Sequence, residues 1–504
     1  MDRRHLLRLL GTATAAPLFD GVPFLSALGD TIGASPRPRL ARAPLRLAPV
    51  VRGPEFTLRA QERVVEIAPG VNARVWSPGD GPVGPTVEAR AGERLKIRLE
   101  NALPEHTILH WHGLRVPEAA DGHPRLAIAS GQHYDYDIPI IDRAGTYWYH
   151  SHAHHRTGIQ AYRGMAGLFI VRDEHESQWQ LPAGAHELPL LIQDRRLTPT
   201  GEFEYNPVMH EVMEGYFGDT PFVNGIRLPI HDVETTTYRL RLVNATTSRI
   251  LRLALSNGAS LQLIGGDGGL FERSETVDSI DLATGERADV LVDFSKVPVG
   301  QSVSLVSQPF PSPVNGMGMG MGRGMGMGMG MGRMGGGGIP QGGAMTLLEF
   351  RVVHGVTPKP WASPLAMART LAPPERSTRS PARTRTFRFD SMAMQHTING
   401  RTFDMERMDV TIPFGETEIW QFENASPFPH PVHVHEVQFD VMQRIGGRGR
   451  IMPWERGPKD TVLVMPGEQV RVRVIFDAYR GRFLMHCHNL VHEDAGMMLN
   501  FEIV

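Results

Sequence analysis

The amino-acid sequence predicts an all-β protein made of three homologous β-sandwich domains. Short runs in which apolar and polar residues alternate, such as 94–99 and 470–474, are bounded by glycine and proline, as strands of antiparallel sandwiches are. A strand-like phrase ending in Asn-Ala occurs three times, at Asn101, Asn244 and Asn424, and an Asn-Gly turn precedes the last two copies. Because the copies are spaced by the length of a domain, we interpret them as repeats of one fold.

Length and composition agree with this prediction. The chain has 504 residues, enough for two to four domains, and its 41% hydrophobic and 21% charged residues are typical of a globular protein. A net charge of −2 gives no reason to expect a nucleic acid or an anionic membrane as partner. Beyond the N-terminus, no stretch is apolar for long enough to span a bilayer.

The N-terminus predicts an export signal. A twin arginine, Arg3-Arg4, precedes a short apolar run and small residues between Gly11 and Ala16. We therefore expect the twin-arginine export machinery as a partner and a periplasmic or secreted location. Residues 1–45 are assigned to this signal and to a proline-rich linker.

Domain boundaries follow from the repeats and from composition. We expect domains at 46–180, 181–357 and 386–504, with a Pro/Arg/Ser-rich linker at 358–385. Residues 316–338 of the middle domain are almost all Gly, Met and Arg, with eight methionines. Such a segment cannot pack a core, so a flexible loop is expected there, followed by the last strand of that domain around 346–350.

Four His-x-His pairs are the first sign of chemistry. Residues i and i+2 of a strand share a face, so each pair presents two imidazoles in the same direction. Two pairs lie in the first domain, two in the third and none in the middle domain. Because imidazole is a good copper ligand, eight converging rings could hold three copper ions. The eight residues are His110, His112, His150, His152, His433, His435, His486 and His488.

The segment 486–497 contains the chain's one cysteine, Cys487, which cannot form an intrachain disulfide and is expected to be a metal ligand or a nucleophile. On a strand it points away from its two flanking histidines, so it could bind one copper while they bind the cluster. Two histidines, a cysteine and a weak methionine form a blue-copper site. Cys487, His492 and Met497 supply three of these ligands, and the fourth is expected to be His430, the leading histidine of the segment 430–435.

These motifs make the chain similar to the three-domain bacterial multicopper oxidases of the laccase and cuprous-oxidase family, from about residue 55 to the end. The resemblance implies cupredoxin-like Greek-key domains, four copper ions, and coupling of four one-electron oxidations to reduction of dioxygen to two waters. It implies a type 1 copper bound by His430, Cys487 and His492, with Met497 axial. The implied type 2 ligands are His110 and His433, and the two type 3 sets are His112, His150, His488 and His152, His435, His486.

Two acids match positions that follow ligand motifs in related cuprous oxidases. Asp121 follows the first His-x-His pair, and Glu493 follows the last ligand histidine. A carboxylate beside a dioxygen-reducing cluster is a plausible proton relay, and we expect that role for both. His154 and His155 match no ligand of the family and are expected at the surface.

The reductant is less sharply defined. Thioether sulfur prefers Cu(I), so the methionine-rich loop favours a cuprous oxidase that protects against copper. The acid and methionine that precede the first type 1 histidine in enterobacterial cuprous oxidases are replaced here by Ser426 and Phe428. A laccase acting chiefly on phenols is therefore the main alternative. A copper nitrite reductase lacks the type 3 pairs, and a non-enzymatic cell-division relative lacks the ligands, so both are disfavoured.

Overall fold

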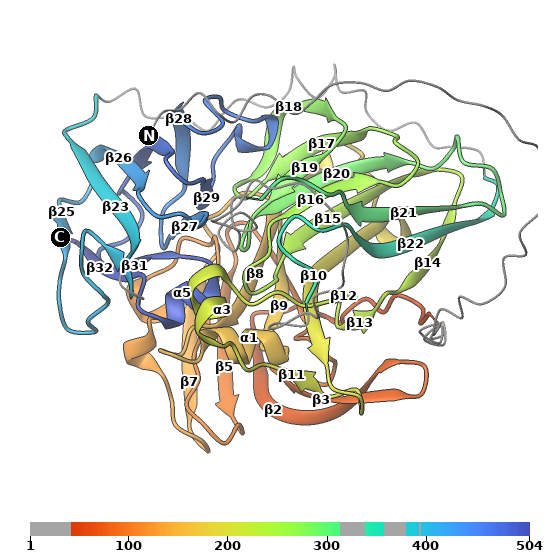
Figure 1. Cartoon of the computed structure of the whole chain (residues 1–504), viewed down its shortest axis with the longest axis horizontal. Coiled ribbons are helices and arrows are strands. Elements are labelled where there is room, and N and C mark those ends of the chain that lie inside the picture. Colours follow the sequence, from red (N-terminus) through yellow and green to blue (C-terminus); the bar gives the residue numbers. More distant parts are fainter. Residues whose placement is uncertain (1–41, 313–337, 357–379, 393–394) are drawn as a thin grey trace, which may run out of the picture. The chain divides into compact units, whose positions relative to one another are not determined.

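A computed structural model describes residues 42–312, 338–356, 380–392 and 395–504 (Figure 1). Strands dominate this part of the chain and the helices are short, so the predicted all-β fold class is confirmed. The twin-arginine segment and residues 316–337 of the methionine-rich loop lie outside the described residues. None of the described helices is long and apolar enough to cross a membrane.

The first domain has two sheets, with strand orders β1-β4-β9-β8-β6 and β3-β2-β5-β7. Buried side chains that include Trp111, Tyr136 and Phe169 form its core. Helices α1 (Thr157–Arg163) and α2 (Glu174–Ser177) flank β9, and short 3-10 turns occupy Glu118–Ala120 and Pro124–Leu126; a further 3-10 turn, Gly184–His186, leads into the middle domain. The strands are β1 (Val50–Val51), β2 (Glu55–Ala68), β3 (Val71–Ser77), β4 (Thr86–Arg90), β5 (Arg94–Asn101), β6 (Leu109–His110), β7 (His133–Pro139), β8 (Gly145–Ser151) and β9 (Ala166–Arg172).

The middle domain pairs the sheet β13-β12-β10-β15-β20-β17-β18, to which β11 adds beside β10, with the sheet β14-β22-β21-β16-β19. Helix α3 (Met209–Glu214) lies between β11 and β12. The strands are β10 (Glu187–Leu197), β11 (Phe203–Glu204), β12 (Thr220–Val223), β13 (Ile226–Arg227), β14 (Ile230–Glu234), β15 (Thr237–Asn244), β16 (Leu251–Leu255), β17 (Leu261–Gly266), β18 (Gly269–Val277), β19 (Ile280–Leu282), β20 (Arg287–Asp293), β21 (Ser302–Ser307) and β22 (Met345–His354).

The third domain consists of the sheets β24-β23-β26-β30-β28 and β25-β32-β31-β27-β29. Helix α5 (Leu490–Asp494) follows β31, and a 3-10 turn covers Pro453–Glu455. The strands are β23 (Thr384–Met392), β24 (Gln395–Ile398), β25 (Val410–Ile412), β26 (Thr417–Asn424), β27 (His430–Val434), β28 (Phe439–Ile445), β29 (Thr461–Val464), β30 (Gln469–Ile475), β31 (Gly481–Cys487) and β32 (Met498–Ile503).

The three-fold repeat has a structural cause. Asn101, Asn244 and Asn424 end β5, β15 and β26, and each side-chain amide donates to two main-chain carbonyls at 2.7–2.9 Å. Each side-chain oxygen accepts an N–H from two residues further on. One asparagine therefore closes the same corner of each sandwich, because only an amide supplies two donors and an acceptor there.

Pairing is mainly antiparallel, as the alternation predicted, but each domain also contains parallel pairs. β5, β15 and β26 run parallel to β2, β10 and β23, respectively. The Asn-Gly turns begin with Asn224 and Asn399 at φ of 52° and 54°, and the glycines that follow are also at positive φ. That geometry is typical of tight hairpin turns. Residues 42–45, at the end of the expected linker, lie against β14 through paired main-chain bonds with Ile230.

Candidate metal centre

Strand pairing brings the histidine pairs together. His110 of β6 lies opposite His150 of β8, and His433 of β27 lies opposite His486 of β31. The second histidine of each pair stands just beyond the end of its strand. All eight rings are buried, although they come from opposite ends of the chain. The first and third domains thus each supply four rings to one cluster.

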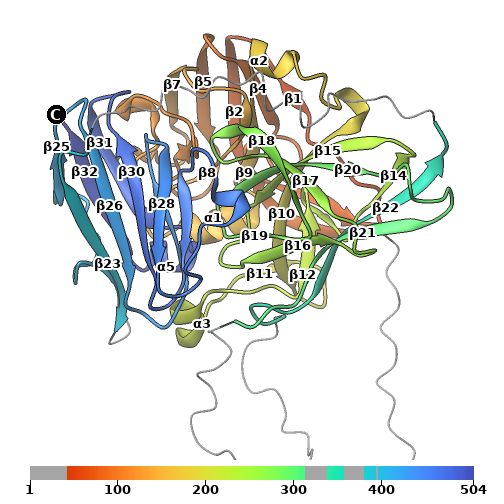
Figure 2. The ribbon, with the colours of Figure 1, turned by 90° about the horizontal axis from the view of Figure 1, so that it is seen from above.

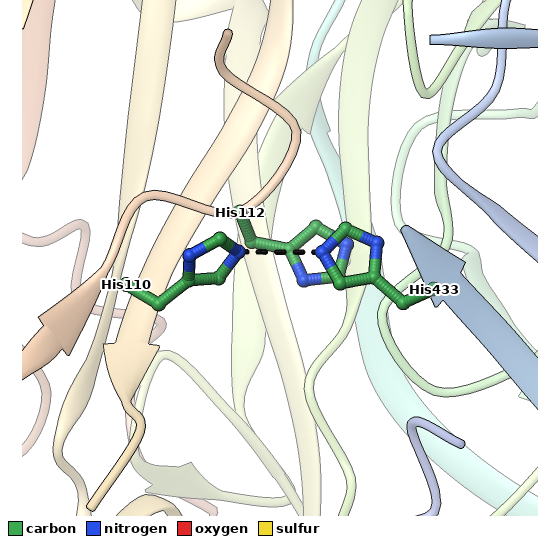
Figure 3. A group of neighbouring side chains, drawn as sticks. All are labelled: His110, His112 and His433. Carbon is green, nitrogen blue, oxygen red and sulfur yellow. Dashed lines mark hydrogen bonds between the residues drawn. The ribbon is translucent and has the colours of Figure 1, made fainter. Parts of the chain in front are cut away.

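The eight rings form three groups, each compact enough to hold an ion. One contains His110, His112 and His433 (Figure 3). The Nε2 atoms of His110 and His433 lie 3.3 Å apart, and the ring of His112 stacks on that of His433 with centroids 3.8 Å apart. The other two groups are His112, His150, His488 and His152, His435, His486.

The Nε2 atoms of neighbouring rings direct their lone pairs toward one another. Nδ1 of His110 donates to the carbonyl of Asp121 at 2.7 Å, and Nδ1 of His433 donates to the carbonyl of Asp460 at 2.9 Å. A neutral imidazole has one N–H, so the two Nε2 atoms that meet between these rings are both acceptors. The same Nε2-to-Nε2 contact recurs at 3.1–3.4 Å in three other ring pairs of the cluster. Without a cation, these buried lone pairs would have no partner.

Burial keeps the rings neutral and therefore able to bind a metal. It lowers the pKa of His433 to about 3. Burial first, and neighbouring rings second, hold the pKa well below the usual imidazole value at His112, His150, His152, His435 and His488. Neutral imidazoles are the ligand form that copper requires, so the donor set fits copper.

Both predicted acids lie behind one group of rings. An oxygen of Asp121 lies 2.8 Å from Nδ1 of His435, and the side chain is fully buried. Glu493 places one oxygen 3.2 Å from Nδ1 of His486 and the other 3.7 Å from Nδ1 of His152. Asp121 thus orients the ring of His435 by a hydrogen bond, as acids behind metal-ligating histidines commonly do, whereas Glu493 stands behind His152 and His486 without a hydrogen bond to either.

The blue-site residues also meet. Nδ1 of His430 lies 3.4 Å from the sulfur of Cys487, Nδ1 of His492 lies 3.7 Å from it, and the two Nδ1 atoms are 3.3 Å apart. Burial raises the pKa of the Cys487 thiol well above its usual value, so a metal would have to displace its proton. Met497 is buried in the same core, and its main chain bonds to those of Cys487 and His492.

The far nitrogens of the two blue-site rings are held in different ways. Nε2 of His430 lies 2.6 Å from the hydroxyl of Ser426. Nε2 of His492 donates to the carbonyl of Met213, at the end of α3, at 3.1 Å. The ring of His396 stacks on His492 with centroids 4.0 Å apart, and its Nε2 bonds to the carbonyl of Val212 at 2.9 Å. The middle domain therefore covers the blue site, and α5 contacts both α1 and α3 (Figures 1 and 2).

Sequence motifs did not identify every residue around these sites. His396 and the acid Asp460, whose carboxylate lies 2.9 Å from Nε2 of His112, have no spacing that points to the ligands, and the sequence identifies Ser426 only as a replacement for an acid and not as a partner of His430. His154 and His155 belong to none of the metal-holding groups in the described residues, and His155 is exposed.

Comparison with known proteins gives one consistent answer. Family profiles described as multicopper oxidase match residues 59–176, 213–308 and 373–504. A laccase of Haloferax volcanii is 31% identical over 85% of this chain and 78% of its own length. The cell division protein FtsP of Escherichia coli is 31% identical over 90% of this chain and 91% of its own length.

The solved structures include the McoA multicopper oxidase of Aquifex aeolicus. It superposes with a TM-score of 0.78 at 31% identity and covers 92% of this chain and 100% of its own. The resemblance to cupredoxin-like domains is thereby confirmed. With the three profiles matched and both clusters of donor side chains assembled, this chain belongs to the multicopper oxidase family.

Proposed function

We propose that this chain binds four copper ions and couples four one-electron oxidations to the reduction of dioxygen to two waters. Copper would supply one-electron redox chemistry at the blue site and dioxygen reduction at the histidine cluster. The blue site would use His430, Cys487 and His492 with Met497 as a weaker fourth ligand, and the cluster would use the eight His-x-His residues as assigned above. The proposal is carried by the end of β31, which contributes residues to both the blue site and the histidine cluster. Cys487 faces His430 and His492, while the residues on either side, His486 and His488, belong to two different groups of the cluster.

The protein's own residues prepare both sites. Cys487 is bonded through the main chain to His486 and His488, which gives electrons a short covalent route between the sites. Asp121 and Glu493, each buried and each beside ligand rings, are suited to pass protons to the cluster. The carboxylate of Asp121 would also fix the Nδ1 proton of His435 and leave Nε2 free for the metal.

A small reductant, Cu(I), is the substrate we propose. The ring of His492 is fully buried and its outer nitrogen is already bonded to Met213. A bulky phenol therefore has no free edge of this ligand to contact. A metal ion bound near α3 could still deliver an electron across the covering residues.

The ends of the methionine-rich loop support this choice. Phe310, before the loop, donates its N–H to the carbonyl of Gly342, after it, at 3.0 Å. Arg249 bonds the carbonyls of Ile339 and Gly218, so the loop returns to the segment that follows α3. The described chain on either side of the methionine-rich segment thus lies close to α3, and soft thioethers between these two ends could gather Cu(I).

The decisive experiment changes those methionines without touching any proposed ligand. All eight are replaced by leucine in one variant, and residues 316–338 are replaced by a few Gly and Ser in another. Copper content and blue absorption should match the parent in both. Cu(I) turnover should fall in both, mainly through a higher KM, while phenol turnover should hold in the leucine variant. Unchanged Cu(I) turnover in both variants would make the protein a laccase first, as the name of the Haloferax relative suggests.

Copper content also tests the non-enzymatic alternative. A protein that shared the fold of FtsP only as a structural component would bind no blue copper after loading. We further propose export by the twin-arginine pathway, based on Arg3 and Arg4. Replacing both with lysine should keep the protein in the cytoplasmic fraction, and unimpaired export of that variant would exclude this route.

A further inference from the structure

The ring of His112 is turned the opposite way from the other seven rings of the cluster. Each of those seven places Nε2 against the Nε2 of another ring, at 3.1–3.4 Å. Nε2 of His112 instead lies 2.9 Å from a carboxylate oxygen of Asp460 and 3.1 Å from the hydroxyl of Thr461. Its Nδ1 has no hydrogen-bond partner among the described residues. His112 can therefore serve the cluster only through Nδ1.

We propose that Asp460 and Arg287 form a positioning pair that fixes the tautomer of His112, so that its Nδ1 lone pair faces the cluster. This inference rests on the ligand set proposed above. An ionised carboxylate only accepts hydrogen bonds, so the ring must carry its proton on Nε2. The lone pair is then left on Nδ1, as metal sites require of a ligand held from behind.

Arg287 keeps the acid in place. Its Nη1 donates to an oxygen of Asp460 at 2.7 Å and its Nη2 bonds the other oxygen, while both side chains are fully buried. A guanidinium that contacts both oxygens of a buried acid is matched to the ionised carboxylate, so Asp460 faces His112 as an acceptor. The two-pronged contact also fixes the plane of the carboxylate.

The guanidinium is itself held by all three domains. It donates to the carbonyl of Thr146 at 3.1 Å in the first domain and to the carbonyls of Gly285 and Asp267 at 2.9 Å in the middle domain. Its third-domain partner is Asp460. The middle domain provides no histidine to the cluster, yet through Arg287 it sets the orientation of one.

The residue that follows His112 leaves room for the Asp460–Arg287 pair. Gly113 follows His112 directly and has φ of +90°. A Cβ at this position would lie 2.3 Å from Nη2 of Arg287 and 2.7 Å from an oxygen of Asp460. Any larger residue would displace the ion pair, which explains why a glycine stands next to the ligand.

The test is Asp460→Asn in the full-length, copper-loaded protein. The amide has nearly the shape of the acid but can also donate, so it no longer enforces one tautomer of His112. Copper of the cluster should become about 10- to 100-fold easier to remove with a chelator. The near-ultraviolet band of the coupled copper pair should weaken and the amount of paramagnetic copper should rise above that of the parent, while the blue absorption stays.

Asp142→Asn is the matched control. Asp142 is also a buried acid paired with an arginine, Arg115, at 2.8 Å, but it contacts none of the cluster histidines. Both variants should lose stability, because each leaves a guanidinium without its charge partner, and the loss should be larger for Asp460→Asn since Arg287 is fully buried whereas the Arg115 side chain is 31% exposed. Only Asp460→Asn should change copper retention and the spectra at a temperature where both are folded.

The outcomes separate this inference from the proposed function. If the parent protein binds no copper, the proposed function fails. If the parent binds copper and Asp460→Asn retains it with the same affinity and spectra, the positioning pair is refuted. Should Asp460→Asn not fold, Arg287→Lys replaces it, since lysine keeps the charge but cannot hold both oxygens. Arg287→Lys should then lose cluster copper more readily than the parent, and equal retention would overturn the inference.

Discussion

Helix α3 is expected to control which reductants reach the blue site, and Glu211 offers a way to loosen it. This buried side chain accepts the N–H of Val208 at 2.9 Å, which caps the helix, and lies 2.6 Å from Nη1 of Arg196. Losing a cap costs about 1 kcal/mol. Losing a hydrogen bond to a charged group costs about 1.5–3 kcal/mol more, although partial exposure of Arg196 favours the low end.

Glu211→Ala should therefore destabilise the closed position of α3 by about 2.5 kcal/mol, which raises the fraction of molecules with α3 displaced about 70-fold. If a bulky phenol must wait for that opening to reach His492, its kcat/KM should rise by up to the same factor. Cu(I) turnover should change far less, since a small ion does not need the ring edge. The two reductants are compared on one preparation with unchanged blue absorption.

Glu211→Gln is the control, because glutamine still accepts the N–H of Val208 but no longer pairs with Arg196. Glu211→Gln should raise kcat/KM for the phenol less than Glu211→Ala does. Hydrogen exchange of the α3 amides reports whether the helix has loosened. Faster exchange in Glu211→Ala with unchanged phenol turnover would refute the idea that α3 restricts access to His492.

Three further outcomes are expected. Cys487→Ser should abolish the blue absorption and substrate oxidation while the cluster keeps its copper, and a blue variant would contradict the ligand assignment. Met497→Leu should remain blue with a higher reduction potential in a redox titration, because axial ligands are weak, whereas loss of the blue copper would make this residue structural. Asp121→Asn and Glu493→Gln should slow reoxidation by dioxygen but not anaerobic reduction by substrate, in stopped-flow measurements of the blue band; normal reoxidation in both would exclude the relay.

The grouping of the donor side chains could be predicted because each motif is encoded locally. Two histidines separated by one residue on a strand must share a face, and Cys487 between two of them must point away. The repeated Asn-Ala phrase was equally informative, because one asparagine closes the same corner in each domain. Such patterns depend only on neighbours in the chain, so one sequence is enough to show them.

The supporting residues depend on tertiary structure and left no local pattern. Asp460 meets His112 only after the first and third domains have docked, and Arg287 joins them from the middle domain. The contact between His492 and the middle domain could not be predicted for a different reason. The acceptor is the main-chain carbonyl of Met213, and every residue has such a group. The alternating runs that predicted antiparallel sandwiches gave no sign of the parallel partners of β5, β15 and β26, since a period-two pattern does not show the direction of the neighbouring strand.

The division of the cluster between the two ends of the chain has a consequence for assembly. Four rings come from residues 110–152 and four from residues 433–488, so the cluster cannot be loaded before His488 has been synthesised. Copper bound by the proposed ligands would then hold the first and third domains together. A ligand at a thousand times its dissociation constant adds about 4 kcal/mol to the state that binds it. Removing the metal should accordingly weaken the docking of these domains before it unfolds either sandwich. The stability of the interface between them would then depend on the supply of copper.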